Sequence, residues 1–302
     1  MQRAEDDGRP NSNSRRGDKD NSNPTTITYT SVITAWSRSQ RPDAARRAEA
    51  VLSDMVYAHE RMRDASIRPN KLTYGAVIAA WAASDEVVAG DRAQGILGEL
   101  IDRYSRGENN DDCRPNAVMF NSTIHALSKN SSTDANDRAR EVIANMWRLY
   151  DNCGKPDVRP STTTYNSLLN CLAKSRRDGS AEEALELLRQ METDSAIPSP
   201  DIYSYVSVVD ALATEASPDA SKKARTIVAR VEALYRQSSD PDLKPNILLY
   251  TGLVRAVESG GELESATIHS IEDHVRREGI RTDEVFCRSV KSALERVETA
   301  QA

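Results

Sequence analysis

The sequence has few large aromatic residues and no long hydrophobic run. Only two of its 302 residues are phenylalanine and three are tryptophan, so Ala, Leu, Val and Ile supply most of the apolar content. Small aliphatic residues are typical of helix–helix contacts rather than β-sandwich cores. No segment reaches the roughly 18 to 20 consecutive apolar residues that a membrane-spanning helix requires. The composition therefore predicts a soluble all-α protein that has no transmembrane segment.

Cysteine is scarce, and the common catalytic motifs are absent. The four cysteines, Cys113, Cys153, Cys171 and Cys287, form no C-x-x-C pair, which argues against a zinc ribbon, a redox motif or a secreted disulfide framework. We expect them to be reduced thiols. The sequence has no H-E-x-x-H, G-x-x-x-x-G-K-[ST] or G-x-S-x-G motif, and its histidines do not cluster. We therefore expect no enzymatic activity, no metal and no cofactor.

What the sequence does contain is an internal repeat. A proline followed by Asn, Asp or Ser recurs, and an aromatic residue lies four positions after the polar residue. The prolines are Pro69, Pro115, Pro160, Pro200 and Pro245, and a weaker Arg281-Thr282-Asp283 closes the series. Apolar stripes at i, i+3, i+4 and i+7 begin at Tyr29, Tyr74, Phe120, Tyr165, Tyr205 and Tyr250. This spacing predicts six amphipathic helices whose aromatic residues pack in the core.

A second helix is predicted in each unit after a breaker segment such as Ser259-Gly260-Gly261. Its stripe begins with a small residue in five units, at Ala48, Ala93, Ala139, Ala184 and Ala224, and is less regular in the sixth. Ser180 and Glu183 have the spacing of a capping box for one of these helices. The helix pairs predict a right-handed α-solenoid.

The predicted organisation has three parts. Residues 1–23 are expected to be a disordered polar segment, and residues 284–302 a C-terminal capping helix. Between them, residues 24–283 are divided into six repeats, approximately 26–70, 71–116, 117–161, 162–201, 202–246 and 247–283. The aromatic residues are separated by 45, 46, 45, 40 and 45 positions, more than the roughly 34 residues of a minimal two-helix unit. We expect a lengthened second helix, reaching Tyr104, Tyr150 and Tyr235, and a polar loop to supply the difference.

These features resemble the pentatricopeptide repeat family, in its P-type form with lengthened repeats. The resemblance is carried by Thr164-Tyr165-Asn166-Ser167-Leu168-Leu169, by the segment from Ala181 to Met191 and by the Pro-Asn or Pro-Asp pairs. It covers roughly residues 25–283 and is strongest in the unit from Thr162 to Asp201. The tetratricopeptide repeat, a peptide-binding solenoid, has small residues, a Leu-Gly pair and a Tyr at other positions, and this set of marks is missing here. Prolines end units in both families, but the aromatic followed by Asn or Thr soon after a Pro-Asn or Pro-Asp pair favours the pentatricopeptide repeat. The resemblance implies a solenoid that binds single-stranded RNA with one base per repeat.

The resemblance also implies which residues would contact RNA. The residue after the aromatic and the polar residue after the proline would contact the edge of a base; the candidates are Thr30, Asn121, Asn166 and Thr251 at the first position and Asn70, Asn116, Ser161, Asp201, Asn246 and Asp283 at the second. Most carry small hydrogen-bonding side chains. Residues two positions before the aromatic would sandwich the bases: Ile27, Leu72, Val118, Thr163, Tyr203 and Leu248.

The family's pairing rule then assigns a base to four units. Thr30 with Asn70 implies adenine, Asn121 with Ser161 a pyrimidine, Asn166 with Asp201 uracil, and Thr251 with Asp283 guanine. Gly75 and Val206 depart from the pattern, so the second and fifth units are left without an assigned base.

Several alternatives remain open at the level of sequence. Each polar residue after a proline is also suited to cap a helix, and Arg38, Lys129 and Lys174 suit either phosphate contact or the negative end of a helix dipole. The net charge of −6 favours a second function, a protein-interaction scaffold in an RNA-processing or ribosomal assembly. A third is a fragment of an RNA-processing enzyme.

The resemblance implies a mitochondrial or plastid location. The first seven residues, MQRAEDD, are acidic, however, whereas transit peptides avoid acidic residues. We expect single-stranded RNA to be the partner and expect no membrane association.

Overall fold

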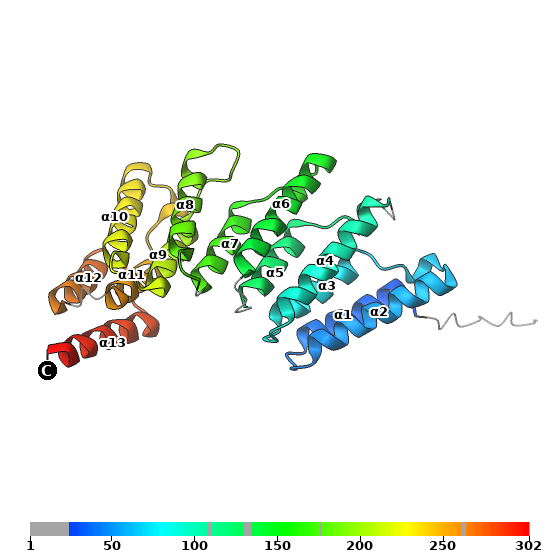
Figure 1. The fold of residues 1–302 in the computed structure, drawn as a ribbon, viewed down its shortest axis with the longest axis horizontal. Helices are drawn as coiled ribbons and strands as arrows, with labels where there is room; N and C mark the ends of the chain where they lie inside the picture. The colour runs from blue at the N-terminus through cyan, green and yellow to red at the C-terminus, as the bar shows by residue number, and fades with distance from the viewer. Residues whose placement is uncertain (1–23, 108–109, 130–133, 176, 261–263, 302) are drawn as a thin grey trace, which may run out of the picture.

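The protein is an array of helix pairs. The computed structural model describes residues 24–107, 110–129, 134–175, 177–260 and 264–301. Within them the regular elements are all helical and stack side by side from α1 and α2 at one end to α13 at the other (Figure 1). The all-α solenoid predicted from the sequence is confirmed. The predicted disordered segment, residues 1–23, lies outside the described residues.

Two sets of helices alternate along the chain. The odd-numbered helices are α1 (Thr26–Arg38), α3 (Lys71–Ala83), α5 (Ala117–Ser128), α7 (Thr162–Lys174), α9 (Ile202–Glu215), α11 (Ile247–Ser259) and α13 (Glu284–Gln301). The even-numbered helices are α2 (Ala44–Met62), α4 (Ala89–Ser105), α6 (Ala135–Cys153), α8 (Ser180–Thr193), α10 (Ala220–Ser238) and α12 (Ser265–Arg277). Each odd helix packs on the next odd helix, and each even helix packs between the odd helices before and after it. The odd helices therefore form one continuous layer, and the even helices cover it.

The predicted apolar stripes form the core between these layers. Tyr74, Phe120, Tyr205 and Tyr250 are at most 1% exposed, and the alanines that begin the even-helix stripes are fully buried. Small residues at these positions allow the paired helices to approach closely. The tyrosine hydroxyls remain satisfied: Tyr205 donates to Glu192 at 2.9 Å and Tyr250 to Glu232 at 2.8 Å. Burial, followed by the neighbouring carboxylate, raises the pKa of both tyrosines.

The extra length of the units lies in the longer even helices, as the sequence predicted, and also in short 3₁₀ turns. Helices α4, α6 and α10 include Tyr104, Tyr150 and Tyr235, as predicted. Short 3₁₀ turns, such as Pro156–Val158 and Pro241–Leu243, then lead into the next odd helix. These turns were not predicted. Helix α8, with 14 residues, is shorter than α4, α6 and α10 and belongs to the unit whose aromatic residue lies 40 positions before the next one.

Two details of the even helices differ from the prediction. Ser180 is not a helix cap, because Gly179, with φ +84°, occupies that position and Ser180 is the first residue of α8. Its hydroxyl is buried and accepts a hydrogen bond from Asn136. Helix α12 is regular and buries Ile268, Ile271 and Val275.

Candidate nucleic-acid interface

A row of exposed apolar residues follows the first turns of the odd helices. The second residue of α1, α3, α5, α7, α9 and α11 is in each case the predicted base-sandwiching residue. The exposed fractions are 78% for Ile27, 65% for Leu72, 69% for Val118, 56% for Tyr203 and 44% for Leu248, and Thr163 is also exposed. Large apolar side chains repeated at one position along an array form a surface suited to flat, apolar ligands. The fold therefore places all six predicted residues in one repeating position.

The polar residues that follow the prolines cap the odd helices. Asn70 accepts hydrogen bonds from the backbone N–H groups of Leu72 and Thr73. Asn116 and Asn246 make the same kind of contact at the starts of α5 and α11, as does Asp201 at the start of α9. Ser161 caps α7, and Asp283 accepts from the N–H of Phe286 at 2.7 Å. The capping alternative is thus present at all these positions, and it uses one side-chain oxygen of each.

Asn166 and Asp201, the pair predicted for uracil, are in direct contact. Asn166 Nδ2 donates to Asp201 Oδ1 at 2.9 Å, although the residues lie on successive odd helices or their caps. Buried Ser204 donates to Asn166 Oδ1 at 2.6 Å and therefore fixes the orientation of the amide. The second N–H of Asn166 and the second oxygen of Asp201 remain as one donor and one acceptor beside each other.

Thr30 and Asn70, the pair predicted for adenine, are joined through one residue. The hydroxyls of Thr30 and Thr73 lie 3.0 Å apart, and Thr73 donates to Asn70 Oδ1 at 3.1 Å. Thr73, like Ser204, is fully buried at the third position of its helix. A buried hydroxyl at this position thus connects the two predicted base-contacting residues in both units. A hydroxyl also lies three residues after the cap of α7, at Thr164, but not after the caps of α5 and α11.

The remaining predicted pairs are arranged differently. The Asn121 side-chain oxygen is buried without a hydrogen-bond partner, so a ligand donor would satisfy it. Thr251 is buried, and its hydroxyl donates to the Ile247 carbonyl at 2.8 Å. At Gly75, an added Cβ would lie 3.0 Å from Met119 Cε. Val206 is largely buried. The second and fifth units therefore present no polar side chain here.

Cationic residues follow the same face of the two central odd helices. Asn121 and His125 on α5 and Lys129 at its C-terminal cap are spaced four residues apart, as are Asn166, Asn170 and Lys174 on α7, so each set shares a helix face. Burial, then Lys174 and Lys129, lowers the pKa of His125. Lys129 also contacts Asp85 at 3.3 Å. The third predicted cation, Arg38, is exposed in the last turn of α1.

Other kinds of site find no support in the described part of the chain. Across these residues, no group of three or more His, Cys, Asp or Glu side chains is arranged to hold a metal ion. None of the described helices combines the length and the apolar content needed to span a bilayer. The four cysteines are free thiols, and burial raises the pKa of Cys171 to about 11.

The fold and this repeated surface define a helical-repeat protein of the α-solenoid class. Residues 148–212, which include α7, α8, Asn166 and Asp201, match the family model of the pentatricopeptide repeat domain. This segment therefore carries the pentatricopeptide repeat that the sequence motifs predicted.

Solved structures of similar fold include pentatricopeptide repeat protein PPR10 from maize. That match has 20% identity and a TM-score of 0.47 and covers 91% of this chain and 37% of that one. Two structures of PPR10 in complex with an 18-nt psaJ RNA element, one of them a triple cysteine-to-serine variant, match with 15% identity and a TM-score of 0.33. They cover 90% of this chain and 46% of theirs. This chain thus spans less than half the length of these structures. No curated protein sequence matches it.

Proposed function

We propose that this protein binds single-stranded RNA along its odd helices, with the exposed residues of the first turns sandwiching the bases. The observation that carries the proposal is the Asn166–Asp201 contact beside exposed Thr163 and Tyr203. It places a hydrogen-bonding pair next to a row that can stack on bases. The binding of RNA by PPR10 belongs to that protein. For this chain, the family match of residues 148–212 supports the same expectation.

The Asn166–Asp201 pair is suited to uracil. Uracil presents a carbonyl oxygen beside its N3–H group, so it needs one donor and one acceptor side by side. The free N–H of Asn166 and the free oxygen of Asp201 supply them. Cytosine presents an unprotonated N3 in the same place, which would face the Asp201 carboxylate without a proton between them. For the remaining units we propose adenine at Thr30/Asn70, a pyrimidine at Asn121/Ser161 and guanine at Thr251/Asp283.

The protein would act sterically, without catalysis, in RNA processing, stability or translation in a mitochondrion or plastid. Binding along a groove is sufficient to protect an RNA end or to hold a structure open. We propose the same six repeat boundaries as from the sequence. The net charge of −6 favours the alternative function, a protein scaffold within a ribonucleoprotein assembly.

Selection from a pool of short single-stranded RNAs, at several salt concentrations, tests the proposal. We expect enrichment of A-x-Y-U-x-G in the order of the units, where Y is a pyrimidine and x is unspecified. Asn166→Ala should relax the uracil position alone. If no RNA binds below about 10 micromolar at low salt, where electrostatic affinity is greatest, the RNA function is wrong and the scaffold function takes its place.

A further inference from the structure

An ion pair joins the fifth and sixth units on the face of the odd helices that carries the candidate base-contacting residues, the candidate RNA face. Asp210 on α9 lies four residues after Val206, and Arg255 on α11 lies four residues after Thr251. Arg255 Nη1 donates to Asp210 Oδ1 at 3.0 Å. On α5 the same helix position holds His125. The ion pair therefore lies in line with the cationic residues of the central units.

The Asp210 carboxylate is only partly accessible to water. The backbone of α11 approaches it closely, because an added Cβ at Gly252 would lie 3.2 Å from Asp210 Oδ1. Burial raises the pKa of Asp210, and the neighbouring Arg255 opposes this effect. Water screens a partly buried charge less than a fully exposed one. The charges of Asp210 and Arg255 therefore act mainly on each other.

Arg255 is the only Lys or Arg residue in α9 or α11. The positions that Lys129 and Lys174 hold in the third and fourth units are occupied by Thr214 and Ser259 in the fifth and sixth. A phosphate that passes these two helices would therefore meet one cation on this face, and that cation is bound to the carboxylate of α9.

We propose that Asp210 limits the contact of the fifth and sixth units with RNA, because it holds the one cation of α9 and α11 that could bind a phosphate. The inference rests on the RNA-binding function proposed above. Asp210 does not supply affinity for RNA but restricts phosphate contact to the units that carry Arg38, Lys129 and Lys174. When a neutral residue replaces Asp210, Arg255 can turn to a phosphate and the contact extends to α11.

An ion pair that only joined α9 to α11 would behave differently. Breaking it would lower the unfolding midpoint and leave RNA binding unchanged. Asparagine has nearly the shape of aspartate, but it can hold Arg255 only through a hydrogen bond to a neutral amide oxygen. Because Asp210→Asn also removes a charge that burial disfavours, the unfolding midpoint should not fall. RNA binding and thermal stability therefore separate the two roles.

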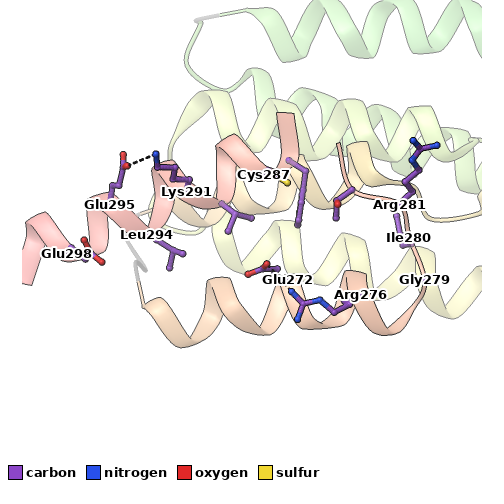
Figure 2. A pocket seen from close by; sticks show the side chains of 13 residues that line it. Glu272, Arg276, Gly279, Ile280, Arg281, Cys287, Lys291, Leu294, Glu295 and Glu298 are labelled. Carbon is purple, nitrogen blue, oxygen red and sulfur yellow. Dashed lines mark hydrogen bonds and ion pairs between the residues drawn. The ribbon is translucent and has the colours of Figure 1, made fainter. Parts of the chain in front are cut away.

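Asp273 and Arg276 on α12 provide a matched control. They form an ion pair at 3.4 Å, and both side chains are exposed. Arg276 also lines a cavity of about 800 Å³ between α12 and α13, together with Glu272 and Lys291 (Figure 2). Because α12 is an even helix, this pair lies outside the candidate RNA face. Asp273→Asn changes the net charge by the same amount as Asp210→Asn, so it measures the effect of charge alone.

The test is fluorescence anisotropy with the full chain and a labelled single-stranded RNA that contains A-x-Y-U-x-G. We expect Asp210→Asn to bind this RNA about five-fold more tightly than the wild type at low salt, because one charge-assisted contact to a phosphate is gained. The slope of log K against log salt should steepen by about 0.7. An RNA that ends at the uracil, A-x-Y-U, should bind both proteins equally, since it does not reach α11.

Two further variants identify the source of the gain. Arg255→Gln in the Asp210→Asn background should abolish the gain in affinity and in slope, and Asp273→Asn should produce neither. If Asp210→Asn changes neither quantity for the longer RNA, if the gain survives Arg255→Gln, or if Asp273→Asn gives the same gain, Asp210 does not limit RNA binding. The proposed function then stands, because the wild type still binds. If neither the wild type nor Asp210→Asn binds RNA below about 10 micromolar at low salt, the proposed function and this inference fail together.

Discussion

At the scale of single residues, the contact that most directly shapes base recognition is made by a residue that need not touch RNA. The hydroxyl of Ser204 holds Asn166 so that its amide nitrogen faces Asp201. Without that hydroxyl, the Asn166 amide can rotate and present its oxygen instead. Ser204 is therefore a positioning residue for the proposed uracil site.

Ser204→Ala tests this role. We expect the preference for uracil over cytosine at the fourth unit to fall about ten-fold, because the hydrogen bond from Ser204 that orients the Asn166 amide joins two neutral groups. Total affinity for RNA should change less than two-fold on the same basis. Binding of RNAs that differ only at this base provides the measurement. The control is Ser207→Ala, because the Ser207 hydroxyl on the same helix donates to the Tyr203 carbonyl and not to Asn166. Equal loss of affinity for uracil and cytosine would assign Ser204 a purely structural role.

His125 should make RNA binding dependent on pH. Burial lowers the pKa of His125, and so do Lys174 on α7 and Lys129 at the C-terminal cap of α5. Helix α3 offers only Ala79 and Ala83 at the corresponding positions. A phosphate bound beside these cations would raise the pKa again, so binding takes up a proton and affinity rises as pH falls below about 6.5. The slope of log Kd against pH should vanish in His125→Asn and persist in His269→Asn. A slope that survives in His125→Asn would refute the assignment.

At the scale of helices, the sequence predicted the starts of helices well where a few neighbouring residues determine them. The starts of α3, α5, α7, α9 and α11 follow from a proline and a capping residue, both visible in four or five consecutive residues. The contact of Ser204 with Asn166 was missed because 38 positions separate the two residues and only the stacking of α9 on α7 joins them. The 3₁₀ turns were missed because their prolines and aspartates also suit an irregular loop. Contacts that depend on how one helix is placed against the next could therefore be seen only in the structure.

Helix α4 offers a matched test of that placement. An added Cβ at Gly90 would lie 3.0 Å from Leu127 Cδ2 and 3.1 Å from Leu127 Cα, whereas one at Gly95 would meet nothing within 4 Å. Gly90→Ala should destabilise the protein by ~1–3 kcal/mol through overpacking against α5. Gly95→Ala should stabilise it by ~0.5–1 kcal/mol through helix propensity. Urea unfolding of both variants checks this; stabilisation by Gly90→Ala would contradict the close approach of α4 and α5.

At the scale of the whole molecule, the net charge of −6 conceals an uneven distribution. Many acidic side chains are used in ion pairs between units, such as Glu49–Arg92, Asp91–Arg138 and Glu183–Arg140. Each of these pairs joins two successive even helices, whereas the base-sandwiching row lies on the odd helices. Lys129 directly follows α5, which carries Asn121, and Lys174 is the last residue of α7, which carries Asn166. A negative protein can thus offer RNA a short cationic track.

The size of that track sets the salt dependence of RNA binding. Each phosphate that a cation neutralises on a single strand contributes about −0.7 to the slope of log K against log salt. Arg38, Lys129 and Lys174 together predict a slope of about −2, or roughly a 15-fold loss of affinity between 50 and 200 mM salt. Replacing both lysines with glutamine should reduce the slope to about −0.7. Lys155→Gln with Lys222→Gln removes the same charge from a turn and an even helix and should leave the slope near −2. If both double variants changed the slope equally, long-range charge rather than direct contact on α5 and α7 would govern binding, and the cationic track would lose its assigned role.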